Sequence, residues 1–462
     1  MYYDALIIGA GLSGLATGIR LAMFDLKVCI VEKHVEIGGL NSFYTRKGRV
    51  FDVGLHAMTN YAPKGARSTP LGKLLKQLRI PHDDFRLCQQ RVSEIRFPDK
   101  SLRFTNDFEF FAQEVREQFP GQTDGFEKLL KHIREFDELS LDDRAPVSAR
   151  QVLEDCLSDP LLIEMILCPL MFYGSAREDD MDFYQFVIMF KSIYMEGLAK
   201  PQGGMRYILN LLAEKYKSLG GEFRMGAAVE SIDTHNGAFR SLTLSGGETL
   251  GAERAISSIG YVETLRLCRP PVAHEDPEAI GRISFIESLF VVDRQPRELG
   301  YDRSIVFYSV EPRFRYRVPE GPADTDSGVL CCANNFDYPE PLPEGLIRLT
   351  NLANHDRWAH LPRREYIEAK KEWRGRALEK LRKFLPDFRE SVVFLDTFTP
   401  KTIFKYTGHI NGAVYGSPQK IKSGVTPIQN LFICGTDQGF LGIVGATLSG
   451  ISMANLHVLK GL

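Results

Sequence analysis

The sequence predicts an α/β fold whose parallel sheet is assembled from discontinuous segments, with an α+β domain inserted between them. Three observations support this prediction. Residues Tyr3–Ile8 form a short, apolar, β-rich run that leads directly into a glycine turn. A second strand and glycine turn, Leu431–Gly435, lies near the other end of the chain. Between them, runs with helical periodicity alternate with strand-like runs.

Composition indicates a globular protein of about two or three domains. The 462 residues are 44% hydrophobic and 25% charged, and the formal net charge of −2 gives no overall attraction to nucleic acid. The eight cysteines form no CxxC pair, which favours a reducing, cytoplasmic location. The ten histidines show no metal-ligand spacing, so we expect no metal. No apolar run reaches the roughly 18 residues of a membrane span.

The N-terminal segment has the order of a dinucleotide-binding unit. The predicted strand at Tyr3–Ile8 is followed by Gly9–Gly14 (GAGLSG) and an amphipathic helix over about Ser13–Phe24. A second strand, Lys27–Glu32, ends in an acid. Strand, glycine turn, helix, strand and acid at this spacing indicate a Rossmann-type nucleotide site.

Each glycine of this motif has a physical task. Gly9 permits the tight turn, Gly11 lets the backbone approach a pyrophosphate, and Gly14 lets the helix pack against the strand. The helix start offers free N–H groups and a positive dipole to the phosphates. Glu32 is expected to accept hydrogen bonds from the adenosine ribose, which disfavours a 2′-phosphorylated cofactor.

The next segment favours FAD over NAD. A second glycine pair, Gly38-Gly39, follows soon after Glu32, and Phe51–Met58 (FDVGLHAM) comes next. In an NAD dehydrogenase no part of the cofactor would require a second glycine pair just after the acidic residue that binds the ribose. The ribityl and ring of FAD extend along this backbone, and the glycines allow their close approach.

This run resembles the FAD-binding signature of the amine oxidase and phytoene desaturase superfamily. The closer resemblance is to the carotenoid isomerase and retinol saturase branch, whose members carry a similar EK…GG…FDVG stretch. Saturases also have a Gly-x-His like Gly54–His56, where bacterial-type phytoene desaturases more often have Gly-Pro-Thr. Amine oxidases usually have Arg after the glycine pair, where this chain has Leu40.

The C-terminal segment resembles the ending of the same families. Leu431–Gly435 is followed by Thr436–Gly439, and Gly442–Ala446 opens a last helix. The resemblance implies that Asp437 binds the ribityl or the pyrophosphate. It also implies that the helix start at Gly445 faces the flavin N1–C2=O edge, where its dipole would stabilise negative charge.

The middle of the chain adds one more expected contact. Residues Pro201–Gly204 (PQGG) match the P-x-GG helix entry of family members. In those proteins the residue at the Val229 position contacts the adenine through its backbone. Taken together, the residues expected to bind FAD are Gly9, Gly11, Ser13, Gly14, Glu32, Lys33, Gly38, Gly39, Ser42, Gly54, His56, Ala57, Met58, Val229, Gly435, Asp437, Val444, Gly445 and Ala446.

The segments divide into two domains by these assignments. The FAD-binding domain comprises 1–75, 200–264 and 396–462, and the inserted substrate domain comprises 76–199 and 265–395. Periodicity predicts helices over 108–119, 125–139, 149–155 and 363–384, and strands over 283–293 and 304–309. The apolar stretch 159–198 is open to two interpretations, membrane-facing helices or an interior helix pair.

The resemblance implies an enzyme that acts on carbon–carbon bonds of a lipophilic polyene or isoprenoid of carotenoid or retinoid type. Desaturation, saturation and cis–trans isomerisation share these motifs, and an external electron acceptor or donor is implied. The aromatic-rich inserted segments fit a tunnel for such a substrate, although for any single one of these residues a place in an ordinary core is the expectation. A cytoplasmic protein with peripheral membrane contact is compatible with both.

His56 is the candidate proton-transfer residue, because it follows the Asp52–Gly54 run toward the expected position of the flavin ring. The alternative is a histidine that only hydrogen-bonds the backbone or the flavin. Tyr173 is a second candidate.

Two other functions compete with this interpretation. An FAD-dependent amine oxidase is one, and Leu40 and the saturase-like ending count against it. A non-catalytic protein of the Rab escort type, which binds prenyl groups on a related fold, is the other. The intact glycine motifs at both ends of the chain favour a bound FAD over that second alternative.

Overall fold

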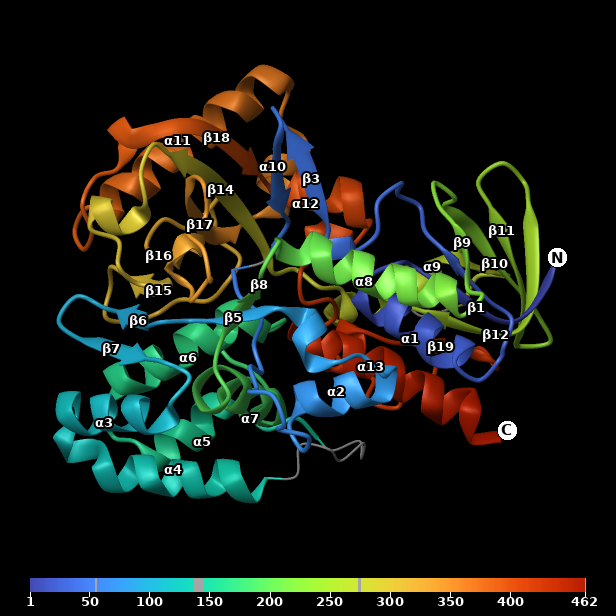
Figure 1. Ribbon diagram of the computed structural model, residues 1–462, viewed down its shortest axis with the longest axis horizontal. Helices are drawn as coiled ribbons and strands as arrows, with labels where there is room; N and C mark the ends of the chain where they lie inside the picture. The colour runs from blue at the N-terminus through green and yellow to red at the C-terminus, as the bar shows by residue number, and fades with distance from the viewer. Residues whose placement is uncertain (55, 137–144, 273–275, 462) are drawn as a thin grey trace.

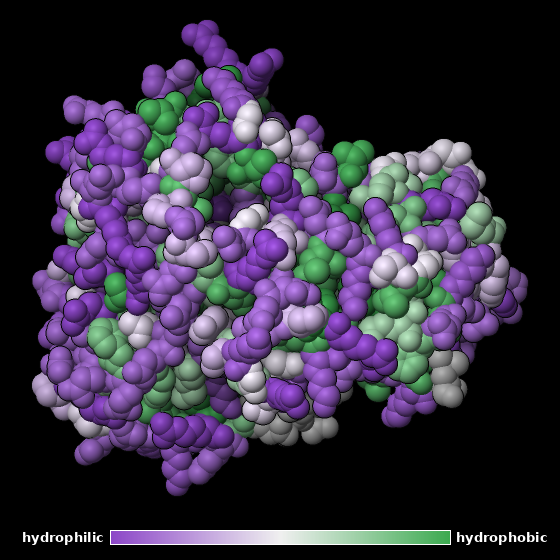
Figure 2. Space-filling view, in the orientation of Figure 1, coloured by the Kyte–Doolittle hydropathy of each residue, from purple (hydrophilic) through white to green (hydrophobic). Residues whose placement is uncertain are grey.

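The protein is organised around two β-sheets that lie side by side (Figure 1). The computed structural model describes residues 1–54, 56–136, 145–272 and 276–461. Both chain termini lie at the end of the molecule that holds the first sheet (Figure 1). The face shown in Figure 2 is mostly hydrophilic, with hydrophobic side chains in scattered patches.

The first sheet has eight strands in the order β13-β10-β11-β12-β1-β2-β9, and β19 also pairs with β12. β1 is parallel to both β2 and β12, and β12 is parallel to β19. The strands are β1 (Tyr2–Ile8), β2 (Val28–Val31), β9 (Glu222–Arg224), β10 (Val229–His235), β11 (Ala238–Leu244), β12 (Thr249–Ser257), β13 (Cys268–Arg269) and β19 (Leu431–Ile433). Strands from the beginning, middle and end of the chain thus form one sheet, which confirms the predicted fold class.

Among the helices that pack against this sheet, three share one core with it around the glycine turn. They are α1 (Leu12–Ala22), α8 (Gly204–Ser218) and α13 (Gly442–His457). α1 and α13 are close neighbours, because Gly450 has no side chain and its Cα approaches the backbone of Ser13. The two glycine-led helices predicted at opposite ends of the sequence therefore lie together.

The second sheet has seven strands in the order β18-β14-β17-β16-β15-β6-β7. All its pairings are antiparallel except that of β15 with β6. The strands are β6 (Ser93–Arg96), β7 (Ser101–Phe104), β14 (Ser284–Val292), β15 (Ile305–Ser309), β16 (Ser327–Cys332), β17 (Gly345–Ala353) and β18 (Val392–Phe398). Every residue of β14 is buried, so this sheet is covered on both faces.

Helices cover the second sheet. α11 (Arg363–Leu381) packs on one face through Trp373, which joins a core with Phe290 and Leu349 of the sheet. The other layer holds α3 (Phe108–Gln118), α4 (Thr123–Glu135), α5 (Ala149–Cys156), α6 (Pro160–Gly174) and α7 (Phe183–Phe190). The predicted helices 108–119, 149–155 and 363–384 are confirmed. The one expected over 125–139 ends at Glu135, and 137–139 lie outside the described residues.

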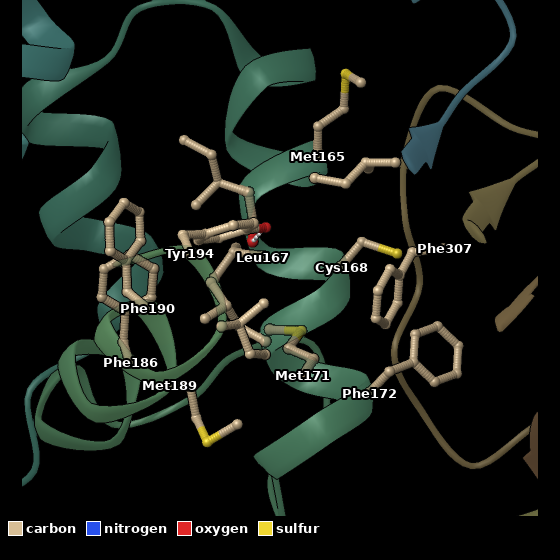
Figure 3. Close-up of a cluster of buried hydrophobic side chains, with 14 of the residues drawn as sticks. Met165, Leu167, Cys168, Met171, Phe172, Phe186, Met189, Phe190, Tyr194 and Phe307 are labelled. Atoms are coloured by element: carbon tan, nitrogen blue, oxygen red, sulfur yellow. Dashed lines mark hydrogen bonds between the residues drawn. The ribbon is translucent and has the colours of Figure 1, made fainter. Parts of the chain in front are cut away.

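The stretch 159–198 is an interior helix pair, which corrects the membrane-facing interpretation. Every residue from Leu162 to Phe172 on α6 is buried. Figure 3 shows the side chains of α6 enclosed by Phe186 and Phe190 of α7, by Tyr194 and by Phe307 of the sheet. A helix that is apolar on all sides fits such an interior position. No helix among the described residues is long and apolar enough to cross a membrane.

Several short elements were not predicted. They are the hairpin β3 (Phe43–Arg46) and β4 (Arg49–Asp52), the pair β5 (Leu87–Gln89) and β8 (Ala199–Pro201), and the helices α2 (Pro70–Leu78), α9 (Tyr261–Leu267), α10 (His355–Ala359) and α12 (Pro400–Thr407). The start of α12 could have been predicted from the sequence, since Thr399 and Thr402 form a capping box and Pro400 occupies the first turn. The domain boundaries stay a prediction; β13, at 268–269, pairs with the first sheet although it falls in the segment assigned to the inserted domain.

The interior position of α6 is testable. Leu167→Ala should lower the free energy of unfolding by about 2–5 kcal/mol, because Leu167 is fully buried and its truncation leaves a cavity. Ile367→Ala on α11 is the control, since Ile367 is 51% exposed and its truncation should cost within about 0.5 kcal/mol. Urea unfolding followed by circular dichroism measures both, and equal midpoints for the two variants would contradict the buried placement.

Candidate active site

The glycine turn between β1 and α1 has the shape that a bound pyrophosphate requires. Gly9 has a φ of +96°, which favours glycine. A Cβ at Gly14 would overlap the carbonyl oxygen of Gly9, so the helix packs directly on the turn. A Cβ at Gly11 would meet nothing within 4 Å, because this position faces open space. The residues therefore fit the roles predicted for the motif.

A cleft of about 460 Å³ begins at this turn, and we call it the nucleotide cleft. α1 starts at the cleft after Gly11 without a side-chain cap, so its first-turn N–H groups have no side-chain partner. This is the arrangement that binds phosphate. Of the predicted residues, those that line the cleft are Gly9, Gly11, Ser13, Glu32, Lys33, Gly38, Gly39, Val229, Gly435 and Ala446.

Glu32 is held in place at the end of β2. Its Oε2 accepts a hydrogen bond of 2.7 Å from the Ala10 N–H, and its Oε1 accepts one of 2.9 Å from the His34 N–H. Each carboxylate oxygen accepts two hydrogen bonds, so both retain capacity for ribose hydroxyls. The carboxylate is fixed at the wall of the nucleotide cleft and is still able to bind there.

A second cavity of about 160 Å³ adjoins the nucleotide cleft, and we call it the His56 cavity. Leu40, Asn41, Thr436 and Ala446 line both spaces. Gly54, His56 and Ala57 line the His56 cavity, so this part of the predicted set lies beyond the nucleotide cleft. α13 also begins there with Gly442 and Ile443 and without a side-chain cap, so its positive end faces the cavity.

The remaining predicted residues lie elsewhere. Ser42 lines a third cavity, and its Oγ donates to the Ile37 carbonyl at 2.7 Å. Gly14, Met58, Asp437, Val444 and Gly445 line none of these three cavities.

Asp437 is buried and accepts hydrogen bonds from two loops. Its Oδ1 accepts from the Ser417 N–H at 2.8 Å and its Oδ2 accepts from the Tyr261 N–H at 2.6 Å. The side chain is buried behind the cleft and holds two loops, while its neighbour Thr436 lines the wall. The ribityl or pyrophosphate role that the resemblance implies for Asp437 stays a prediction.

A buried ion pair lies beside the ring of His56. Glu287 of β14 and Arg348 of β17 are each 1% exposed, and Arg348 Nε donates to Glu287 Oε1 at 2.7 Å. Thr350 Oγ1 donates to Glu287 Oε2 at 2.7 Å. His56 Nε2 lies 3.1 Å from the same Oε2 and 2.8 Å from Thr350 Oγ1. All of these side chains except Arg348 line the His56 cavity.

These contacts fix the charges at the site. Burial by itself would raise the pKa of Glu287, but the Arg348 guanidinium and the hydrogen bonds from His56 and Thr350 lower it to about 2. Burial lowers the pKa of His56, and the positive charges of Arg348 and Lys200 lower it further against the opposing effect of Glu287. The carboxylate is therefore ionised and the imidazole neutral near pH 7.

The backbone of His56 is also held. Its carbonyl oxygen accepts from Lys200 Nζ at 3.1 Å and from the Cys331 thiol at 3.4 Å. Lys200 is 4% exposed, and burial lowers its pKa. Ring and backbone of His56 are thus both fixed by residues from other elements.

The tautomer of His56 follows from its partners. An ionised Glu287 accepts only, so Nε2 carries the proton and donates to it. In a neutral ring Nδ1 is then the acceptor. The site presents a fixed, neutral imidazole with one nitrogen able to take up a proton.

Sequence reasoning missed Glu287, Arg348 and Thr350. Glu287 had a signal, because it is the one charged residue within the apolar run Ser284–Val292. Arg348 and Thr350 lie on β17, which was not predicted as a strand. Tyr173, the second candidate, lines the His56 cavity with its ring centroid 6.2 Å from that of His56.

Comparisons with known proteins agree with this architecture. A family model described as flavin containing amine oxidoreductase matches residues 12–456. Prolycopene isomerase 2, chloroplastic, from an Oncidium hybrid cultivar is 22% identical over 511 residues, covering 98% of this chain and 83% of the relative. Phytoene desaturase (lycopene-forming) from Pseudescherichia vulneris is 24% identical over 501 residues, covering 98% of each. The crystal structure of an oxidoreductase from Methanosarcina mazei shares the fold, with a TM-score of 0.70 at 17% identity over 98% of this chain and 99% of that one.

The ion pair generates a stability prediction. Glu287→Gln leaves a buried guanidinium without its counter-charge, which should lower the free energy of unfolding by about 3–5 kcal/mol at pH 7. Because the pKa of Glu287 falls from an ordinary 4.5 to about 2 on folding, its contribution is complete above about pH 4.5. It is lost as the pH falls toward 2.

Urea unfolding of wild type and variant at pH 7, 4 and 3 checks this prediction. The difference in free energy of unfolding between wild type and variant should become smaller at the lower pH values. A difference in free energy of unfolding that does not change with pH, or no difference at pH 7, would show that the pair is not ionised as described.

Proposed function

This chain belongs to the family of flavin-containing amine oxidoreductases and uses FAD, and on that premise we propose that it acts on a carbon–carbon bond of a lipophilic polyene or isoprenoid. Two of its relatives are named as a prolycopene isomerase and a phytoene desaturase. The observation that carries the proposal is the His56 cavity, where one neutral proton-transfer group lies within an apolar wall.

The wall of the cavity suits a hydrocarbon. Its aromatic and aliphatic lining residues are Leu40, Val53, Ala57, Phe172, Tyr173, Phe285, Val329, Phe398, Ile403, Val414, Tyr415, Ile443 and Ala446. Burying apolar surface against such a wall contributes about 25 cal/mol per Å². A polyene therefore gains affinity here without needing a polar partner near the reacting bond.

The charge arrangement disfavours a cationic amine as substrate. An ammonium group in an apolar cavity needs a carboxylate partner. Glu287 is the one carboxylate among the described residues that line the His56 cavity, and it already accepts from Arg348, Thr350 and His56. This supports the polyene over the amine oxidase alternative.

The cofactor and the protein residues have separate chemical roles. When bound, FAD accepts or gives a hydride at N5. His56 then holds or moves the proton: Nδ1 accepts it if the substrate is desaturated, and the protonated ring supplies it if the substrate is saturated. Glu287 and Thr350 keep the ring in place at Nε2, and the apolar wall excludes water.

The proposal includes two partners that lie outside the chain. An external electron acceptor or donor completes the cycle if the reaction is a net oxidation or reduction. Peripheral contact with a membrane supplies a substrate that dissolves poorly in water. Both follow from the chemistry of a lipophilic polyene.

Incubation of the anaerobic holoenzyme with phytoene, a cis-carotenoid and retinol tests the proposal and determines its direction. Bleaching of the flavin absorbance near about 450 nm by the more saturated polyene means desaturation. Reoxidation of the reduced holoenzyme by a polyene means saturation. A changed isomer with unchanged flavin redox state means isomerisation. A protein that is colourless and cannot be reconstituted with FAD, or a flavin that reacts with amines alone, contradicts the proposal.

Removal of the proposed proton-transfer group is a further prediction. His56→Ala should retain bound FAD but lower turnover by about 10²–10⁴-fold, the range typical of a general acid or base. His360→Ala serves as the matched control, because His360 is exposed and lines none of the three cavities. Turnover and flavin absorbance are measured on both variants, and unchanged turnover in His56→Ala would eliminate this role.

A further inference from the structure

Lys200 is a buried cation to which the proposed chemistry gives no part. It is 4% exposed and lies in the middle of β8, directly before the Pro201–Gly204 helix entry. Withdrawing an ammonium group from water is costly. A methionine, which is about as long, would fill the same space without that cost. The contacts of Lys200 show what its charge contributes.

Strand β8 holds the backbone on both sides of the His56 carbonyl. Lys200 Nζ donates to that carbonyl oxygen at 3.1 Å. The neighbouring Ala199 exchanges two hydrogen bonds with Met58: the Met58 N–H donates to the Ala199 carbonyl at 2.8 Å, and the Ala199 N–H donates to the Met58 carbonyl at 3.0 Å. The strand thus fixes the backbone at positions 56 and 58, and Lys200 brings a charge to it.

Two carboxylates favour the ammonium form of Lys200. Burial lowers the pKa of Lys200 and the charge of Arg348 lowers it further, while the negative charges of Asp52 and Glu287 raise it. Asp52 is tied to the residues that follow β8, because its Oδ1 accepts from the Met205 N–H at 2.9 Å. Lys200 is therefore held as a cation between the two carboxylates and the His56 carbonyl.

Opposing charges act on the imidazole of His56. The ionised Glu287 favours a protonated ring, since His56 Nε2 lies 3.1 Å from Glu287 Oε2. Burial lowers the pKa of His56, and the positive charges of Arg348 and Lys200 lower it further. Arg348 is directed at Glu287, to which its Nε donates at 2.7 Å, whereas Lys200 donates to the carbonyl of His56 itself.

The titratable and charged groups around His56 come from several elements. Among the described residues they are Glu287 of β14, Arg348 of β17, Cys331 of β16, Tyr173 of α6 and Lys200 of β8. Burial raises the pKa of Tyr173 and of Cys331, so both side chains stay neutral at pH 7. One carboxylate and two cations therefore set the charge around the ring.

We propose that Lys200 is a positioning residue for His56: its ammonium group holds the His56 carbonyl, and its charge keeps the imidazole neutral so that Nδ1 is able to take up a proton. This inference deepens the proposed function, because it rests on the proton-transfer role assigned there to His56. Without the charge of Lys200, the attraction between Glu287 and a protonated ring is opposed less strongly, and the ring is protonated at a higher pH.

Titration of His56 by nitrogen NMR in the holoenzyme tests this role with Lys200→Met and Lys200→Gln. Both substitutions remove the charge, and glutamine keeps an N–H donor. The midpoint of ring protonation should rise by about one pH unit in each, the lower end of the range for a neighbouring charge. Flavin content and thermal midpoint show which variants are folded, and either neutral variant is sufficient. An unchanged midpoint in a folded neutral variant overturns the inference.

Two further variants separate the charge of Lys200 from a general loss of structure. Lys200→Arg keeps the positive charge and should restore the wild-type midpoint. Lys420→Met is the matched control, because burial lowers the pKa of Lys420 to about 8 and its Nζ also donates to a backbone carbonyl, that of Tyr415, at 2.7 Å. The same rise in Lys420→Met as in Lys200→Met would contradict the assignment.

Failure of this inference is distinguishable from failure of the proposed function. The limb of the pH profile of polyene turnover that follows His56 should move upward by the same amount as the NMR midpoint. A shifted midpoint with an unshifted turnover profile would overturn proton transfer by His56 and leave the effect of Lys200 on the ring in place. Polyene turnover with an unshifted midpoint would overturn the role of Lys200 alone.

Discussion

The buried ion pair between Glu287 and Arg348 is the constraint on which the site depends. Both residues lie on a fully covered sheet, where an unpaired charge would cost several kcal/mol. Glu287 and Thr350 are direct partners across the β14–β17 ladder, and Arg348 is one step along the same face. A shift of one residue in this register would turn the side chains of the shifted strand to the opposite face, against the tryptophan-containing core, and would separate Glu287 from Arg348 and Thr350. The pairing of two strands thus sets the position and charge of His56.

The site is also a meeting point of distant segments. α1 and α13 come from opposite ends of the chain, and their uncapped N-termini lie at the nucleotide cleft and at the His56 cavity. Both helices approach the cofactor site with positive dipole ends, which suits a phosphate at one and developing negative charge at the other. Strands β14, β16, β17 and β18 of the second sheet contribute Phe285, Val329, Thr350 and Phe398 to the wall of the His56 cavity, which the proposed function assigns to the substrate.

The features that could be predicted from the sequence are those set by residues close together in the chain. The roles predicted for Gly9, Gly11 and Gly14 follow from a turn of six residues, and the backbone of the turn and its packing against α1 fit them. His56 was found through its position in the chain. Its partners Glu287 and Thr350 lie more than two hundred residues away, and no local pattern joins them to His56. For the same reason the sequence left the placement of 159–198 open, because the residues that cover α6 come from other elements. Asp437 shows the same limit: the motif located the residue beside Thr436 of the cleft wall, but not its contacts with the Tyr261 and Ser417 N–H groups, which come from distant loops.

At the centre of the site, Glu287 is expected to hold His56 as a neutral imidazole protonated at Nε2. Nitrogen NMR of histidine-labelled holoenzyme, with the His56 signals assigned by their loss in a His56→Gln variant, tests it directly. The ring should be mostly neutral, with its proton on Nε2, from pH 6.5 to 8, because burial lowers the pKa of His56 below its ordinary value of 6.5. A midpoint above pH 6.5, or a ring protonated at Nδ1, would contradict it.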